Sequence, residues 1–401
     1  MVRFVRNPAE DSGVILEFSR KRQVRILAEL LVFGPFFLAW LPGGCKFLLD
    51  AAWVWMACIA GKGAFLWYGK GTRWPLWWAL GGLVLFGAVY LLRYQSAAYF
   101  LWGVRNNFRF YGAFFGFLLL EQEERAEIWR GLEKLFWVNF CLVLVQFAFF
   151  DCKGDYLGGL FGTEKGCNGG LNLFLLVMVA RSLVNRDEKT MCCLAKCTAA
   201  LLLAAMAELK FFFVEFAVLL AFTGFRGKKA VAFGSLLALA GGVYLLGRFF
   251  PEFAGWLRLS SIWETAADPA GYASVGDLNR LNAISEIERR VFSSEWDSLF
   301  GLGLGNCDVS SISFFTTPFS KWYGHLHYSW MSHAFWYLEG GWLGLVFFFG
   351  FFCLVMVGKG GRLARILAAM CLLIGIYNAS LRTEAAFLVY FGLSEGIKRE
   401  I

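Results

Sequence analysis

The chain has 401 residues, of which 58% are hydrophobic and 17% are charged, and its formal net charge is +8. Soluble domains carry about 45–50% apolar and about 25% charged residues, so this composition excludes an ordinary soluble protein. The positive charge does not indicate nucleic-acid binding, because Lys and Arg lie mostly in short segments between apolar runs. The composition predicts a single integral membrane domain over residues 1–401.

The N-terminal stretch MVRFVRNPAEDSGVILEFSRKRQ lacks the continuous apolar core and the small-residue cleavage site of a signal peptide, so we expect the first span to be retained. A spanning helix needs about 20 mostly apolar residues. Such runs occur near 24–42, 48–68, 75–92, 97–120, 134–150, 170–182, 190–207, 210–224, 229–247, 333–357, 364–380 and 385–396. The predicted fold is all-α and polytopic, with about 12 transmembrane helices.

Lys and Arg are concentrated in alternate connections, including SRKRQ, GKGTR, RSLVNRDEK and GKGGRLAR. The positive-inside rule places these connections in the cytoplasm, together with EQEERAEIWRGLEK, FRGKK and GIKRE. Both termini are then cytoplasmic, and the number of spans is even.

One large extracytoplasmic loop, residues 248–332, follows from this topology, between the ninth and tenth spans. Apolar residues recur at helical spacing within it, which predicts a short amphipathic helix over 278–292. They are Leu278, Leu281, Ile284, Ile287 and Val291. The stretch GLGLGN at 301–306 lacks a strand–turn–helix context, so it favours a tight, closely packed turn over a nucleotide site.

Ionisable residues within or beside apolar runs are candidates for function, because they are expensive to place in a membrane. The candidates are Arg105, Arg109, Glu208, Lys210, Glu215 and Glu339, with Arg258, Arg280, Arg289 and Arg290 in the large loop. Each has a structural alternative: the span arginines can pair with Glu215 or with backbone carbonyls, and Lys210 can extend to the interface. Arg289 and Arg290 can form a solvated helix face.

All three histidines, His325, His327 and His333, lie within nine positions at the end of the large loop. Tyr323 and Tyr328 flank them. Singly, each histidine is explained by interfacial packing. Their grouping after an Arg-bearing loop favours a functional site, with His333 as the structural member.

Several stretches together resemble the O-antigen polymerase and O-antigen ligase superfamily of bacterial inner-membrane proteins. They are DLNRLNAISEI, SLFGLGLGN, LHYSWMSHAFWYLEGGWLGLVFFF, DYLGGLFGTEKGCNGGLNLFLLVM, ELKFFFVEFAVLL and LWGVRNN. The family pattern is matched in order by Arg280, Leu299 to Asn306, His327, Glu339, Gly341 and Gly344. Lys210 stands where the family more often has Arg. His327 lies one helical turn further from Gly341 than in the ligases, and Tyr328 replaces the following Asn, which favours the polymerases.

The resemblance implies a GT-C-like membrane protein that transfers glycan from undecaprenyl diphosphate at the outer face of the inner membrane. Arginine suits this chemistry because it is always charged and binds phosphate bidentately. We expect Arg280 to contact the diphosphate, with Arg258, Arg105 or Arg109 as a second contact and Lys210 as a further point charge. His327 or His325 is the expected general base, and Glu339 either orients or replaces it. Trp322, Tyr323, Tyr328 and Trp330 are expected to stack on sugars.

The leading function is repeat-unit polymerase, which joins a lipid-linked chain to a lipid-linked repeat. The alternative is a ligase that moves the finished glycan to lipid A–core or to protein, and the third is a transporter of lipid-linked sugars. Expected partners are the undecaprenyl-diphosphate-linked oligosaccharide, the bilayer and a chain-length regulator. We expect no metal, cofactor or nucleic acid.

Overall fold

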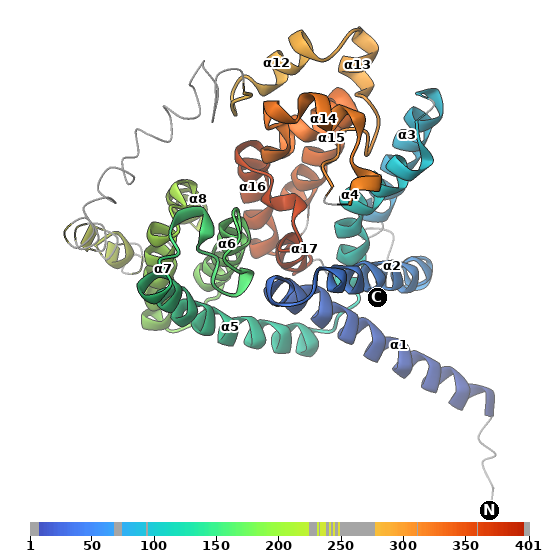
Figure 1. Cartoon of the computed structure of the whole chain (residues 1–401). Helices are drawn as coiled ribbons and strands as arrows, with labels where there is room; N and C mark the ends of the chain where they lie inside the picture. Colours follow the sequence, from blue (N-terminus) through green and yellow to red (C-terminus); the bar gives the residue numbers. More distant parts are fainter. Residues whose placement is uncertain are drawn as a thin grey trace, which may run out of the picture.

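The computed structural model describes residues 8–67, 74–93, 95–223, 277–310, 312–358 and 360–396, and isolated positions between 231 and 248. The described residues form helices and turns and no β-strand, which confirms the all-α prediction for this part of the chain. The longer helices are α1 (Pro8–Phe33), α2 (Lys46–Trp67), α3 (Trp74–Leu92), α4 (Ala97–Leu118), α5 (Gln122–Phe149), α6 (Asn168–Val184), α7 (Thr190–Met206), α8 (Lys210–Thr223), α15 (Ser332–Val357) and α16 (Arg362–Tyr377). Shorter ones are α12 (Ala283–Arg290), α13 (Glu295–Phe300), α14 (Pro318–Tyr323) and α17 (Ala386–Leu393) (Figure 1).

Four segments are long and apolar enough to cross a bilayer: Gly43–Gly61, Trp74–Leu92, Gln122–Phe149 and Ser332–Val357. They leave large apolar side chains exposed, including Val84 at 73% and Leu91 at 70%. Water would not tolerate such continuous apolar surface, whereas lipid does. The chain is therefore a membrane protein.

Most predicted apolar runs are helices with bounds close to those expected, but three differ. Helix α1 extends from Pro8 to Phe33, whereas the predicted run covers 24–42; much of the predicted run at 229–247 lies outside the described residues. The run at 385–396 contains only the eight-residue α17, about 12 Å long at a rise of about 1.5 Å per residue, too short to cross a bilayer alone. Conversely, α5 extends back through the predicted cytoplasmic connection to Gln122. A capping box between Glu121 and Glu124 begins the helix there, and the connection is rich in helix-forming residues.

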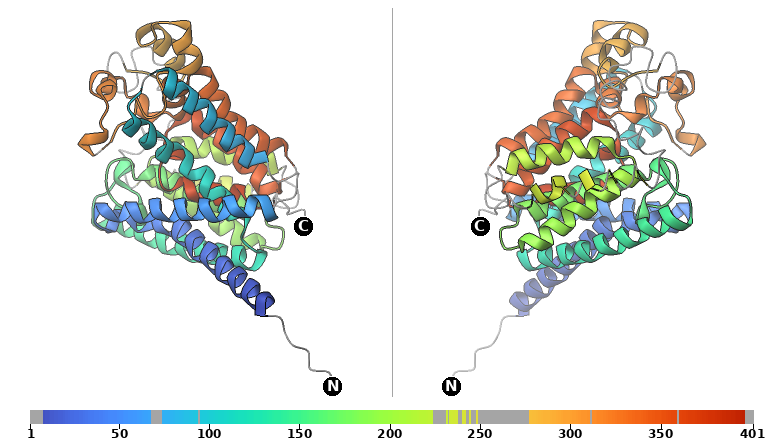
Figure 2. Two further views of the ribbon diagram at one scale, coloured as in Figure 1. Left: turned by 90° about the vertical axis from the view of Figure 1, so that its right-hand side faces the viewer. Right: turned by 90° about the vertical axis from the view of Figure 1, so that its left-hand side faces the viewer.

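The core lies around α17, whose residues are all buried. Helix α17 contacts α4, α6 and α16, while α15 packs along α16 and α2 along α4. Figure 2 shows α3 running beside α15 on the outside of this core. Aromatic rings fill the α3–α4–α15 contact, where Phe347 meets Phe86, Phe108 and Trp336 at centroid distances of 5.4–5.8 Å.

Helix α15 is interrupted at the point where the GLGLGN turn, residues 301–306, packs against it. Gly341 has φ 59° and ψ −153°, which interrupts the helix. The GLGLGN turn packs against the break: Leu302 N–H donates to Leu338 O at 2.8 Å, and Gly303 N–H donates to Glu339 O at 3.0 Å. Gly301, Gly303 and Gly305 all have positive φ, which confirms the predicted tight turn. The turn satisfies carbonyls that the break leaves without helical partners.

The described part of the predicted large loop, residues 277–310 and 312–331, consists of short helices on top of α15 (Figure 1). The predicted amphipathic helix corresponds to α12, in which Ile287 is fully buried. Leu281, by contrast, is 58% exposed, because it precedes the first turn of α12 and so leaves the apolar stripe.

Asp297 attaches α13 to the end of α3. Its carboxylate accepts hydrogen bonds from the backbone and hydroxyl groups of Ser293 and Ser294, and it lies 2.7 Å from Arg93 Nη2. Burial alone would raise the pKa of Asp297, but the bonds from Ser293, Arg93 and Ser294 lower it to about 2. The ionised carboxylate therefore stabilises the folded state.

Asp297→Asn is expected to lower the free energy of unfolding by about 2 kcal/mol at pH 7, from roughly 1.4 kcal/mol per pKa unit. Because the folded pKa lies below the ordinary one, the contribution is present above about pH 4 and is lost as the pH falls to about 2. Thermal unfolding of the detergent-solubilised protein checks this. Equal melting temperatures for wild type and variant at pH 7 would contradict it.

Candidate functional site

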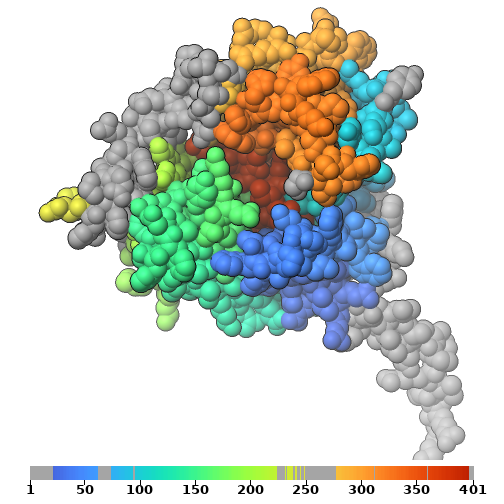
Figure 3. Space-filling view, viewed as in Figure 1, coloured from blue at the N-terminus to red at the C-terminus, as the bar shows by residue number. Residues whose placement is uncertain are grey.

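A cavity of about 710 Å³ opens on the face shown in Figure 3. The red C-terminal segment lies at the bottom of a hollow that is framed by green, orange and blue segments. The volume is typical of sites that hold small organic ligands. Its lining comes from five separate stretches, within 155–172, 208–212, 278–280, 329–331 and 377–383.

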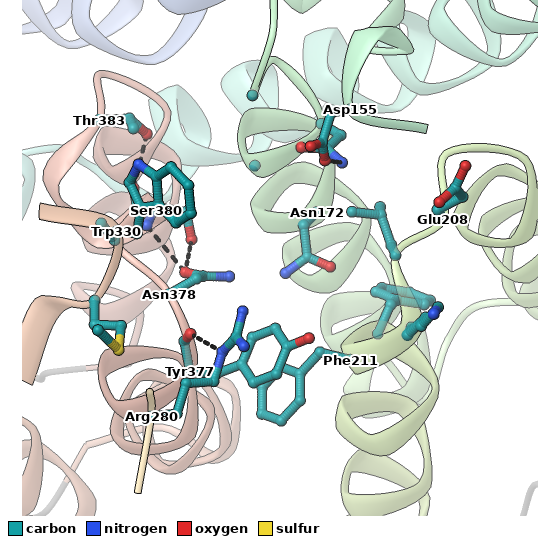
Figure 4. Close-up of a pocket in the computed structure, with 18 of the residues that line it drawn as sticks. Asp155, Asn172, Glu208, Phe211, Arg280, Trp330, Tyr377, Asn378, Ser380 and Thr383 are labelled. Atoms are coloured by element: carbon teal, nitrogen blue, oxygen red, sulfur yellow. Dashed lines mark hydrogen bonds between the residues drawn. The ribbon is translucent and has the colours of Figure 1, made fainter. Parts of the chain in front are cut away.

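Arg280 lies on one wall of the cavity, held against Tyr377. Its Nε donates to the Tyr377 carbonyl at 2.7 Å, and its guanidinium carbon lies 4.1 Å from the centre of the Tyr377 ring. Phe211 also stacks on the Tyr377 ring, with centroids 3.8 Å apart, so this wall carries two aromatic rings. Figure 4 shows the half-buried guanidinium beside these rings, next to the open space. These contacts hold the Nε side of the Arg280 guanidinium against Tyr377 and position its positive charge at the cavity.

The other wall carries two carboxylates and two lysines. Asp155 and Lys165 come from the connection before α6, Glu208 comes from the turn between α7 and α8, and Lys210 is the first residue of α8. The Asp155 carboxylate accepts a hydrogen bond from Asn168 Nδ2 at 2.9 Å. Burial raises the pKa of Glu208, the charge of Asp155 raises it further, and Lys210 lowers it in part.

Between the two walls lies Asn172, which is 3% exposed and points into the space between Arg280 and Glu208 (Figure 4). Its Nδ2 donates to both carboxylate oxygens of the fully buried Glu215, at 3.3 and 3.2 Å. Its Oδ1 has no hydrogen-bond partner among the described residues. Such a buried acceptor is costly unless a donor reaches it.

A run of small polar groups forms the rim beyond the end of α16. The amide oxygen of Asn378 accepts from the backbone and hydroxyl of Ser380, at 2.9 and 2.6 Å. The Thr383 hydroxyl donates to the Ser380 carbonyl at 2.7 Å. The indole of Trp330 also lines the cavity and is 40% exposed. The cavity therefore combines cations, hydroxyl and amide groups, and flat aromatic surface.

Two of the predicted site residues, Arg280 and Lys210, line this cavity together. The histidines do not line it. His327 has φ 53°, its Nδ1 lies 3.0 Å from Asp277 Oδ2, and its ring stacks on Trp330 at 4.0 Å. His327 therefore contacts the lining residue Trp330 but does not line the cavity itself. His325 is exposed and His333 is buried in α15.

The two predicted tyrosines are packing residues in this structure. Tyr328 is buried, and its hydroxyl donates to the Cys307 carbonyl at 2.7 Å. Tyr323 stacks on Phe319 with centroids 4.7 Å apart. Neither ring belongs to the cavity lining.

The arginines of α4 form ion pairs outside the cavity. Arg105 makes two bonds to Asp50, at 3.1 and 2.6 Å, and Arg109 pairs with Glu384 at 3.1 Å. Because both guanidinium groups have carboxylate partners, their positive charge is largely compensated. These contacts agree with the structural alternative: the carboxylate partners are Asp50 and Glu384 in place of Glu215, and Arg109 also donates to the Arg382 backbone carbonyl at 2.8 Å.

Glu339 is fully buried away from the cavity lining. It accepts from Asn107 Nδ2 at 3.4 Å and from the Cys307 backbone N–H at 3.3 Å. These bonds connect the broken helix α15 to α4 and to the turn after GLGLGN. The predicted residue Arg258 lies outside the described residues.

The cavity residues that sequence reasoning did not select include Asp155, Asn172, Phe211, Tyr377 and Asn378. Glu208 was a candidate because its charge lies between two apolar runs, but it received no role, whereas Lys210 was assigned to the diphosphate through the resemblance. The others are ordinary residues at helix ends. Within the described chain, no three His, Cys, Asp or Glu side chains gather closely enough to hold a metal ion.

Comparisons with known proteins give no match. No protein-family model, no curated protein and no solved structure is similar to this chain.

Proposed function

We propose that this protein is a polysaccharide repeat-unit polymerase, which transfers glycan from undecaprenyl diphosphate to a lipid-linked acceptor repeat. The observation that carries the proposal is the cavity that unites Arg280 with Lys210. Arg280 lies in the turn before α12 and Lys210 is the first residue of α8, so two distant parts of the chain meet at the cavity. Arg280 and Lys210 are also the two cavity residues that the resemblance to O-antigen polymerases assigns to the diphosphate.

The electrostatics of the cavity favour a diphosphate. Lys165 and Lys210 add charge across from Arg280, and α6 and α8 both begin at the cavity, at Asn168 and Lys210. Helix N-termini carry partial positive charge and unpaired N–H groups, so they favour anions. As the sugar–phosphate bond breaks, negative charge grows on the diphosphate, and fixed cations stabilise that change.

The remaining lining suits a sugar. The indole of Trp330 offers an apolar face to a sugar ring, while Asn378, Ser380 and Thr383 offer hydrogen-bonding groups for hydroxyls. Arg105, Arg109 and Glu339 take structural roles in this proposal, because each bonds to a side chain of another chain segment: Asp50, Glu384 and Asn107 respectively.

The proposal includes the topology expected from the sequence. About twelve spans in a GT-C-like arrangement, both termini in the cytoplasm and residues 248–332 outside would place the cavity at the outer face of the bacterial inner membrane. The lipid tail of the donor then lies between helices, and the growing glycan extends outward. A chain-length regulator is a further proposed partner.

Deletion of the gene tests the proposal in the native host. A strain without the polymerase is expected to carry surface polysaccharide with a single repeat, as judged by electrophoresis of the extracted glycan. Long chains that remain on the lipid carrier would indicate the ligase alternative. Unmodified lipid-linked repeats retained on the cytoplasmic side would indicate a transporter, and either result would contradict the proposal.

A further inference from the structure

We propose that Glu208 is the general base that removes the proton from the acceptor hydroxyl. This inference rests on the proposed function and assigns its proton-transfer step. In place of the histidines expected from the sequence, it names a carboxylate in the cavity wall opposite Arg280.

The backbone holds Glu208 at the cavity. The residue has φ 54° in a tight turn, closed by a bond from Leu209 N–H to Ala204 O at 2.8 Å. Gly154 lies directly against its carboxylate, since a Cβ at that position would lie 2.6 Å from Glu208 Oε1. A larger residue at 154 would require the carboxylate to move from this position. The Glu208 side chain therefore packs against a chain segment that is far away in sequence.

The charges around Glu208 suit a base. Asp155 and Lys210 act electrostatically on Glu208, and Lys165 also lines the cavity. Arg280 lies across the open space (Figure 4). Burial and Asp155 raise the pKa of Glu208, which makes its carboxylate a stronger proton acceptor than an ordinary exposed one. A general base is most effective when its pKa approaches the working pH.

Asn172 supplies an independent indication that a hydroxyl-bearing ligand enters here. The Asn172 side chain lies between Arg280 and Glu208, and its buried Oδ1 has no hydrogen-bond partner among the described residues (Figure 4). Glu215 binds the nitrogen of this amide, which leaves the oxygen as the atom available to a ligand donor. A sugar hydroxyl would satisfy it.

The proposed step balances in atoms and charge. The acceptor hydroxyl gives its proton to the Glu208 carboxylate while its oxygen forms a bond to the anomeric carbon of the donor sugar. The bond between that carbon and the phosphate oxygen breaks, and its electron pair leaves with undecaprenyl diphosphate beside Arg280. The protonated Glu208 then releases its proton to water.

Glu208→Gln tests the inference, because it keeps the size of the side chain and removes its basicity. The substrate is the lipid-linked repeat extracted from the deletion strain, and the full-length protein is reconstituted in vesicles. We expect kcat/KM to fall by about 100- to 10,000-fold, the usual contribution of a general base. Glu164→Gln is the matched control, because Glu164 is exposed on the neighbouring connection and does not line the cavity.

The pH profile separates catalysis from a structural role. In the wild type, kcat/KM should rise with pH as Glu208 loses its proton and then level off. Asp155→Asn removes the charge that raises the pKa of Glu208, so this rising limb should move to lower pH. Glu208→Gln should abolish the limb while the melting-temperature shift produced by added undecaprenyl diphosphate stays at the wild-type value.

The outcomes are distinguishable. If the wild type forms no new glycosidic bond, the proposed function fails. If the wild type polymerises and Glu208→Gln matches it in rate and pH profile, only the role of Glu208 fails. Loss of the rising limb in His327→Ala instead of Glu208→Gln would assign the base to histidine and overturn the inference.

Discussion

Replacing Arg280 with alanine is expected to lower kcat/KM for glycan transfer by about 100- to 1000-fold, the range seen when one preorganised charge-stabilising donor is removed. The guanidinium is held by the Tyr377 carbonyl and ring at the cavity. We therefore expect it to stabilise the diphosphate without moving during the reaction. Turnover of lipid-linked repeat by the reconstituted variant is the measurement. The melting-temperature shift caused by undecaprenyl diphosphate should also shrink.

Two substitutions define the origin of that loss. Arg280→Lys keeps a positive charge but loses the planar group that lies on Tyr377 and binds phosphate bidentately, so an intermediate loss is expected. Arg289→Ala is the matched control, because Arg289 is 67% exposed on α12 and pairs only with the nearby Glu286 among the described residues. Wild-type turnover by Arg280→Ala would remove this arginine from the mechanism.

Gly341→Ala is expected to destabilise the fold by about 3 kcal/mol or more. The backbone at Gly341 has φ 59° and ψ −153°, a conformation that is nearly restricted to glycine and costs other residues about 1–3 kcal/mol. An added Cβ would also lie 2.5 Å from backbone atoms of Ser298 and Leu299. The α15 break and the end of α13 cannot both keep their positions, so the variant should unfold at a lower temperature.

Gly81→Ala provides the comparison for this prediction. Gly81 lies within helix α3, and a Cβ there meets no atom within 4 Å. Alanine favours helix by about 1 kcal/mol over glycine, so this variant should be as stable as the wild type or slightly more stable. Equal melting temperatures for Gly341→Ala and Gly81→Ala in the same detergent would contradict the role of the break.

The helices of this protein are largely predictable because apolar runs and helices coincide where a helix is surrounded by lipid or by other helices. The runs at 75–92 and 333–357 match α3 and α15 within one residue. The prediction failed where a helix is polar, and where an apolar run contains only a short buried helix. The charged connection before 134 is helical because its residues favour helix, and the run at 385–396 is apolar because α17 is buried in the core.

The site was only partly predictable, since the sequence shows the type of a residue but not its neighbours. Arg280 and Lys210 were selected by charge and by resemblance, and the cavity contains both. Arg105 and Glu339 were selected in the same way, yet Arg105 pairs with Asp50 and Glu339 bonds to Asn107. Tyr377 gave no signal, because its role depends on the contact of α16 with Arg280 and Phe211.

The most direct test of the central claim is the reconstituted reaction with the lipid-linked repeat as the sole sugar substrate. We expect the wild-type protein to form lipid-linked chains of two or more repeats and to release one undecaprenyl diphosphate for each new glycosidic bond, while Arg280→Ala forms almost none. The absence of longer chains with the wild type, or movement of intact lipid-linked repeats across the vesicle membrane without bond formation, would contradict the account.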